Sequence, residues 1–295
     1  MDIVYRYDPH APLTVEAPGT AQEALDRLAQ GNARYSRLVE RMQAAALDKQ
    51  AADQVVIPVT PLTMGIPLAS GLMEPQRPYA MVLGCSDARA PVEHIFDCGA
   101  NEVFVVRVAG NVLGLECLGS VDYAVSQLSE TMRTGIVLGH TGCGAVTAAV
   151  DMYLAPSEYT SLSVRHPVRS LVDRIMLAVR AASRALNERF RGVDPQSPEH
   201  RERLITTAVY LNAAVTAFDV SREVHDIVGQ KVGIAYSVYN VSRSRVSALP
   251  LTGADGDVPA FLASPQSANA FEDLAAEIVA RIDTADASHK TIYLT

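Results

Sequence analysis

The sequence has no tryptophan and only four cysteines among its 295 residues. So few cysteines exclude a disulfide-stabilised scaffold, and in a reducing compartment they stay thiols that are available to a metal or to catalysis. No run of 18 apolar residues occurs, so we expect no membrane-spanning helix. The first residues, Met1–Arg6, lack the apolar core of a secretory signal. We therefore expect a cytoplasmic protein.

Basic residues are also few, with 25 Lys and Arg against 33 Asp and Glu, a net charge of −8 and a pI of about 5.4. An acidic chain offers no electrostatic footprint for nucleic acid or for an anionic membrane surface, so we expect neither as a partner. Hydrophobic residues make up 48% and charged residues 20% of the chain. This composition is typical of a globular protein with a large core and excludes disorder as the dominant state.

Short apolar runs rich in β-branched residues predict strands that are buried on both faces of a parallel sheet. These runs are Tyr79–Leu83, Val103–Val108, Ile136–Leu138 and Lys231–Tyr236, with a further edge strand expected within Tyr239–Leu249. Helical patterns lie between and after them, over residues 91–96, 119–128, 168–186, 204–218 and 271–282. This order predicts an α/β fold with right-handed crossovers, in which helices flank a central, mainly parallel β-sheet.

The first 78 residues have a different character. Thr20 and Glu23 form a capping box that predicts the start of a helix. Gly31-Asn32 predicts its end, and a second helix is expected over residues 35–42. Prolines then interrupt an apolar segment without periodicity between Val55 and Pro78, which predicts an ordered loop on a surface. We expect one domain, with residues 1–78 as a helical arm and proline-rich loop for dimerisation and residues 79–295 as the catalytic core, including a helical insertion around 152–202.

Two motifs place metal ligands at the ends of predicted strands. Cys85–Arg89 (CSDAR) directly follows the first strand of the core, and His140–Gly144 (HTGCG) directly follows the third. Ligands of parallel α/β sheets gather at the carboxyl ends of the strands. Two thiolates and one imidazole bind Zn²⁺ well, and three protein ligands with one open position are typical of a catalytic zinc. We therefore expect Cys85, His140 and Cys143 to hold one zinc ion per chain.

Taken together, the motifs resemble those of the β-class carbonic anhydrases. The resemblance rests on Cys85–Arg89, Phe104–Asn111, Ser120–Ala124 and Gly139–Gly144, and it runs from Ala24 to about Val238. It implies the fold of that family with an N-terminal helical arm, zinc on the three ligands above, and a homodimer or a dimer of dimers. It also implies a reversible hydration of carbon dioxide to bicarbonate and a proton, by hydroxide that the zinc supplies.

The resemblance implies roles for single residues as well. Asp87, paired with Arg89, would accept a hydrogen bond from that hydroxide, whereas an unpaired Asp87 would take the fourth zinc position in a closed state. Gln76 would reach the active site of a neighbouring subunit. The other substrate-binding positions would be Phe104, Ala109, Tyr123 and Gly144.

Two other functions are open at this point. The same scaffold could hydrolyse carbonyl sulfide or carbon disulfide, or the protein could be a non-catalytic zinc protein that senses bicarbonate. The intact pair of Asp87 and Arg89 argues against the second, because metal storage does not need it. Val82 stands where some family members use a tryptophan in a second, inhibitory bicarbonate site, so we do not expect that site.

Overall fold

The computed structural model describes residues 2–7, 16–47, 54–60, 63–66, 70–158, 166–252 and 258–285. Its main sheet has the strand order β4-β3-β5-β6-β7, and β8 also pairs with β6. The strands are β3 (Ala80–Gly84), β4 (Val103–Arg107), β5 (Thr134–His140), β6 (Gly233–Asn240), β7 (Arg245–Ser247) and β8 (Leu262–Ala263). The first four are parallel, while β7 and β8 run antiparallel to β6. The predicted fold class is confirmed, with the two-residue strand β8 as an addition.

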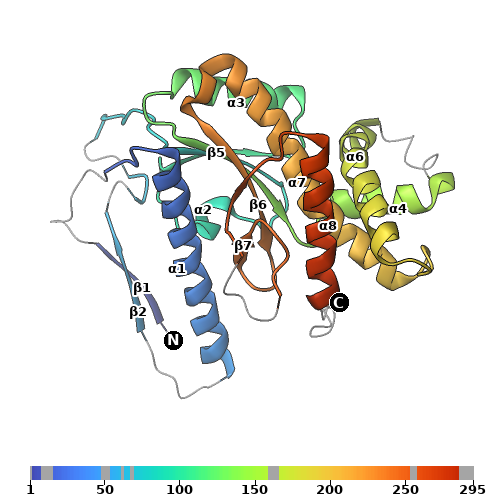
Figure 1. Cartoon of the computed structure of the whole chain (residues 1–295). Helices are drawn as coiled ribbons and strands as arrows, with labels where there is room; N and C mark the ends of the chain where they lie inside the picture. Colours follow the sequence, from blue (N-terminus) through green and yellow to red (C-terminus); the bar gives the residue numbers. More distant parts are fainter. Residues whose placement is uncertain are drawn as a thin grey trace.

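Helices cover both faces of this sheet (Figure 1). The helices are α1 (Ala21–Leu47), α2 (Val92–Ile95), α3 (Leu115–Gln127), α4 (Gly144–Leu154), α6 (His166–Arg189), α7 (Pro198–Val228) and α8 (Ala268–Ala285), with 3-10 turns at η1 (Ala109–Asn111), η2 (Pro156–Glu158) and η3 (Gly229–Lys231). Because side chains alternate along a strand, Met81 and Leu83 face the core cluster that includes residues of α3, α4, α6, α7 and α8. Ala80 and Val82 pack on the other face with α1 and α2. The sheet is therefore buried on both sides, as its apolar strands predict.

Helix α7 lies at the centre of the larger layer. Within the described residues it is the one helix long and apolar enough to cross a membrane, but 67% of its most apolar window is buried inside the protein. It packs against α6, α3 and the strands β5 and β6. Its apolar character is thus accounted for by its place in the core.

Helix α1 begins at the predicted capping box. The Thr20 hydroxyl accepts a hydrogen bond from the backbone N–H of Glu23 at 3.2 Å, and the Glu23 carboxylate accepts one from the N–H of Gly19 at 2.7 Å. Its first half buries Ala24 and Leu28 completely against the sheet. Residues 37–47, in contrast, are mostly exposed. The first half of α1 therefore belongs to the core.

The predicted helix end at Gly31-Asn32 is wrong, because α1 continues through both residues without a break. A Cβ atom at Gly31 would lie 1.9 Å from the carbonyl oxygen of Phe96, so glycine allows the helix to approach that backbone. The buried Asn32 side chain forms hydrogen bonds with backbone groups of Ile95, Ser244 and Val246. These contacts with distant segments outweigh the local preference for a helix end.

The segment after Val55 is also not the loop that was expected. Strand β2 (Gln54–Val59) pairs in parallel with β1 (Asp2–Tyr7), with Tyr5 opposite Ile57. The two strands form a sheet of their own, at the lower left of Figure 1. Residues 61–62 and 67–69 of the segment lie outside the described residues.

Candidate metal centre

Three ligand side chains meet at the carboxyl edge of the sheet. Cys85 follows β3, His140 ends the neighbouring strand β5, and Cys143 is the residue that precedes α4. Their ligand atoms all lie within 4.8 Å of one another, and all three residues are buried. The topology thus brings together two motifs that begin 55 residues apart, at Cys85 and at His140.

The imidazole of His140 is oriented as a metal ligand. Its Nδ1 lies 3.1 Å from the carbonyl oxygen of Thr141, which identifies Nδ1 as the protonated donor. Its Nε2 is buried and has no hydrogen-bond partner among the described residues. Leaving a buried acceptor without a partner costs free energy, and a metal ion would satisfy this one. The set of two sulfurs and one imidazole nitrogen therefore fits zinc.

The two cysteine sulfurs lie 4.0 Å apart, within hydrogen-bond distance of each other. The hydrogen bond from the Cys143 thiol lowers the pKa of Cys85, against the effect of burial, and the backbone N–H groups of Asp87 and Gly110 act in the same direction. The same hydrogen bond, together with burial, raises the pKa of Cys143. This hydrogen bond therefore shifts the pKa values of the two thiols in opposite directions.

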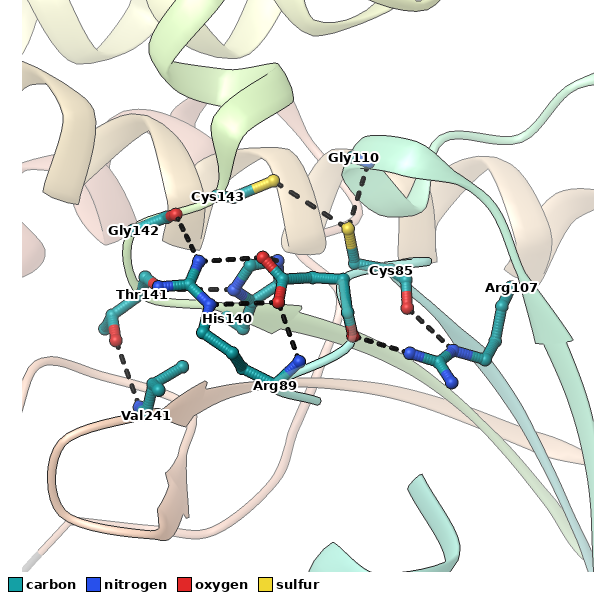
Figure 2. A network of polar contacts seen from close by, with 10 residues as sticks. Cys85, Arg89, Arg107, Gly110, His140, Thr141, Gly142, Cys143 and Val241 are labelled. Atoms are coloured by element: carbon teal, nitrogen blue, oxygen red, sulfur yellow. Dashed lines mark hydrogen bonds and ion pairs between the residues drawn. The ribbon is translucent and has the colours of Figure 1, made fainter. Parts of the chain in front are cut away.

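The loop after β3 is held by Arg107, which ends β4. Its Nε donates to the carbonyl oxygen of Cys85 at 2.9 Å, and its Nη2 donates to the carbonyl oxygen of Asp87 at 2.6 Å. The N–H of Gly110 donates to the Cys85 sulfur at 3.3 Å. Figure 2 shows these contacts on one side of Cys85 and the Cys143 sulfur on the other.

Asp87 and Arg89 form the pair that the motif predicts. Arg89 donates from Nε to Asp87 Oδ1 at 3.0 Å and from Nη2 to Oδ2 at 2.7 Å, and its backbone N–H also donates to Oδ1 at 2.8 Å. These hydrogen bonds lower the pKa of Asp87 to about 2. Arg89 Nη2 also donates to the carbonyl oxygen of Gly142 at 3.1 Å, so the guanidinium bridges both ligand loops. Asp87 Oδ2 lies 3.8 Å from His140 Nε2, next to the metal group.

The loop that carries His140 and Cys143 is tied to strand β6. The backbone N–H of Thr141 donates to the carbonyl oxygen of Tyr239 at 3.0 Å. The hydroxyl of Thr141 accepts from the N–H of Val241 at 3.1 Å. Both ligand loops are therefore fixed by neighbouring strands, β4 on one side and β6 on the other.

The predicted substrate-binding residues are spread around this edge. The rings of Phe104 on β4 and Tyr123 on α3 lie 6.1 Å apart, and Tyr123 is half exposed. Ala109 lies in η1, the turn that approaches Cys85. Gly144 is the exposed first residue of α4, with nothing within 4 Å of where a Cβ atom would stand. Their contact with a substrate stays a prediction.

Gln76 lies at the opposite edge of the sheet from its own chain's metal group. It precedes β3, whereas Cys85 follows it, and a strand of five residues is about 16 Å long. Its side chain is exposed, and its neighbours are anchored to Asn101, which accepts from the N–H of Arg77 and donates to the carbonyl oxygen of Pro75. Gln76 thus lies far from the metal group of its own chain, and its role in a neighbouring subunit stays a prediction.

The other two cysteines lie outside the metal group. Cys117 is buried in the core on α3. The Cys98 sulfur lies 3.6 Å from the Tyr79 hydroxyl, and burial raises the pKa of its thiol to about 12. Neither resembles a metal ligand.

Sequence reasoning gave no role to Arg107 and Gly110, which contact Cys85, or to Asn212, which contacts Gly110. Arg107 and Gly110 lie in the segment that carries the resemblance, but their contacts depend on the fold. Asn212 lies on α7, 102 residues beyond Gly110, and donates to the Gly110 carbonyl oxygen at 2.8 Å. The sequence feature that could have pointed to Asn212 is its position as an amide within an otherwise apolar stretch of a predicted helix.

Comparison with known proteins identifies the family. A family model described as carbonic anhydrase matches residues 80–246, which is more than half of the chain and includes every ligand named above. The chain therefore belongs to the carbonic anhydrase family, and the resemblance to its β class is confirmed. Zinc is the metal of this class, and the Cys85, His140 and Cys143 group is the place for it.

The chain is similar to two mycobacterial carbonic anhydrases. It is 39% identical over 126 residues to one from Mycolicibacterium smegmatis, covering 43% of this chain and 60% of that protein. It is 47% identical over 113 residues to carbonic anhydrase 2 of Mycobacterium tuberculosis, covering 37% and 50%. The matches thus span about half the length of these relatives. A solved β-carbonic anhydrase from Coccomyxa is 20% identical over 75% of this chain and 84% of that one, with a TM-score of 0.44.

Proposed function

We propose that this chain catalyses the reversible, zinc-dependent hydration of carbon dioxide to bicarbonate and a proton. The observation that carries the proposal is the buried Nε2 of His140, which lacks a partner among the described residues and faces two cysteine sulfurs beside a carboxylate that Arg89 holds in place. Membership of the carbonic anhydrase family supports the same reaction.

Cys85, His140 and Cys143 would hold the metal, and zinc would supply there the Lewis acidity that lowers the pKa of water toward neutrality. Two thiolates are more electron-rich ligands than imidazoles, so we expect the activity to favour mildly alkaline pH.

Asp87 acts as a hydrogen-bond acceptor in this proposal. Its Oδ2 lies 3.8 Å from His140 Nε2, close enough to orient a hydroxyl group in the open ligand position. The low pKa of its carboxyl, about 2, keeps it ionised and able only to accept. An acceptor at this position would orient the attacking oxygen toward carbon dioxide when zinc is bound.

Arg89 would keep the Asp87 carboxylate from becoming a metal ligand. Its planar fork binds both carboxylate oxygens, and its bond to the carbonyl oxygen of Gly142 fixes the guanidinium itself. If Arg89 released it, the carboxylate could become the fourth metal ligand and block the reaction. The rings of Phe104 and Tyr123 would form an apolar wall for the uncharged substrate.

The direct test is a stopped-flow assay of carbon dioxide hydration on protein of known zinc content. We expect the rate of carbon dioxide hydration to scale with zinc occupancy and to rise from neutral to mildly alkaline pH. Parallel assays with carbonyl sulfide and carbon disulfide identify the alternative reaction on the same scaffold. A zinc-loaded protein that is inactive on all three substrates would contradict an enzymatic role.

We also propose that the chain acts as a homodimer, or as a dimer of such dimers. Tyr5 and Tyr7 on β1 are 63% and 57% exposed. They help to line an apolar groove of about 460 Å³ with Val59, Thr60, Met64 and Ile66. A two-stranded sheet is marginal alone, and parallel sheets are ordinarily covered on both faces. A second copy covering this surface would also give Gln76 the neighbouring site that its own chain cannot offer.

A further inference from the structure

Asn212 is an amide in the most buried stretch of helix α7. It is 2% exposed, and its neighbours Leu211 and Ala213 are buried in the core as well. Burying an amide costs free energy unless the group is hydrogen-bonded. Its Nδ2 donates to the carbonyl oxygen of Gly110 at 2.8 Å, across 102 residues of sequence. This contact joins the central helix to the turn η1 beside the metal group.

Gly110 connects this helix contact to a zinc ligand. Its N–H donates to the Cys85 sulfur at 3.3 Å, and its φ of 72° lies in the left-handed region. A Cβ atom there would lie 2.9 Å from Cδ1 of Ile175 and 3.0 Å from Cβ of Ala145, so only glycine fits. Glycine is also the residue with the greatest backbone freedom. The direction of its N–H must therefore be fixed by groups outside it.

The peptide plane that follows Gly110 is held at both ends. Asn212 binds its carbonyl oxygen, and its N–H, which belongs to Asn111, donates to the carbonyl oxygen of Val108 at 3.0 Å. With this plane fixed, little rotation is left at Gly110, and the preceding plane keeps its N–H directed at the Cys85 sulfur. Figure 2 shows that N–H above the sulfur.

We propose that Asn212 is a positioning residue for the zinc ligand Cys85, acting through the Gly110 N–H. The inference rests on the metal site of the proposed function. A hydrogen bond to a thiolate withdraws electron density from the sulfur and fixes its direction, and such outer contacts tune both affinity and ligand strength. Loss of the Asn212 amide would leave the Cys85 sulfur a stronger but less well directed electron donor.

Cobalt(II) in place of zinc gives a spectroscopic readout of the sulfur itself, because zinc is d¹⁰ and has no such absorption. We would compare the full-length wild-type protein with Asn212→Ala and with the nearly isosteric Asn212→Leu, whose side chain has no group that can donate to the Gly110 carbonyl. Asn32→Ala is the matched control, since Asn32 is also a buried, hydrogen-bonded asparagine, on α1 at the other face of the sheet.

We expect the thiolate-to-cobalt charge-transfer band to move to lower energy in both Asn212 variants. Their zinc affinity, measured by competition with a chelator, should fall about 10-fold to 100-fold. Asn32→Ala should lose thermal stability but keep the wild-type band. An unchanged band in both Asn212 variants, or an equal shift in Asn32→Ala, would overturn the proposal. A wild-type protein without any thiolate band would instead refute the metal site, and this inference with it.

Discussion

The edge of the sheet that carries the metal group and the surface around β1 and β2 differ in how many of their side chains find partners within one chain. At the edge, the Cys85 sulfur, the Cys85 carbonyl and the Asp87 carboxylate all have partners from the same chain, while His140 Nε2 has none in the described part. Around β1 and β2, apolar side chains such as those of Tyr5 and Tyr7 are exposed. The first arrangement has room for one ion, and the second is suited to a protein surface.

The largest effect is expected from removing a metal ligand. Cys85→Ser or Cys143→Ser should reduce zinc content, measured by elemental analysis, to a small fraction of one per chain and abolish hydration. Cys98→Ala is the control, because its thiol lies beside Tyr79 and not at the metal group. Full zinc in both serine variants together with zinc loss in Cys98→Ala would show that the ligands are misassigned.

The second effect concerns the exposed surface. Tyr5→Ser combined with Tyr7→Ser should weaken self-association about 10,000-fold, because a symmetric dimer loses two tyrosines from each protomer and each contributes about 1.5 kcal/mol. Sedimentation equilibrium over a concentration series measures the change. Because neither residue packs in the core of its own chain, the thermal stability of the monomer should stay the same. An unchanged self-association constant would show that the interface between subunits does not include Tyr5 and Tyr7.

The third effect separates the role of Arg89 from that of the ligands. Arg89→Ala should keep zinc but lower hydration about 10-fold to 100-fold, because the freed Asp87 carboxylate can then occupy the open position. X-ray absorption at the zinc edge would report the added carboxylate. An unchanged coordination sphere with full activity would exclude the role of Arg89 in holding Asp87.

A smaller effect, on the free energy of unfolding, is expected where α1 packs against the backbone of Phe96. Gly31→Ala should cost about 1–3 kcal/mol in the free energy of unfolding, because the new Cβ would collide with the Phe96 carbonyl. Gly119→Ala on α3 is the control, since nothing lies within 4 Å of its Cβ position and alanine favours a helix. Urea unfolding of both variants measures the difference, and equal values would refute the close approach of the two segments.

The smallest effect is the pH dependence that Cys98 adds. Burial raises the pKa of its thiol to about 12 in the folded state, against about 8.5 in an unfolded chain. The folded state therefore favours the protonated thiol, and its contribution is complete below the unfolded pKa and is lost as pH rises to about 12. In urea unfolding between pH 8 and pH 11, Cys98→Ala should show a flatter decline than the wild type. Equal slopes would contradict the burial of this thiol.

The sequence predicts the metal edge better than the N-terminal segment for a physical reason. Cys85 follows one strongly apolar strand and His140 ends another, and parallel topology alone brings such strand ends together. The pairing of β1 with β2 joins segments about 50 residues apart, and no local sequence pattern predicts this pairing. Asn212 and Gly31 are similar, because their roles depend on a carbonyl group supplied by another part of the chain. Tertiary contacts of this kind override local preference and leave little trace in sequence.

X-ray absorption spectroscopy at the zinc edge of the wild-type protein measures the ligand set of the metal itself. We expect about one zinc per chain with two sulfur ligands near 2.3 Å, one imidazole nitrogen near 2.0–2.1 Å and one oxygen in the fourth position. A zinc ion with no sulfur ligands, or one closed by four protein sulfur and nitrogen ligands, would contradict it.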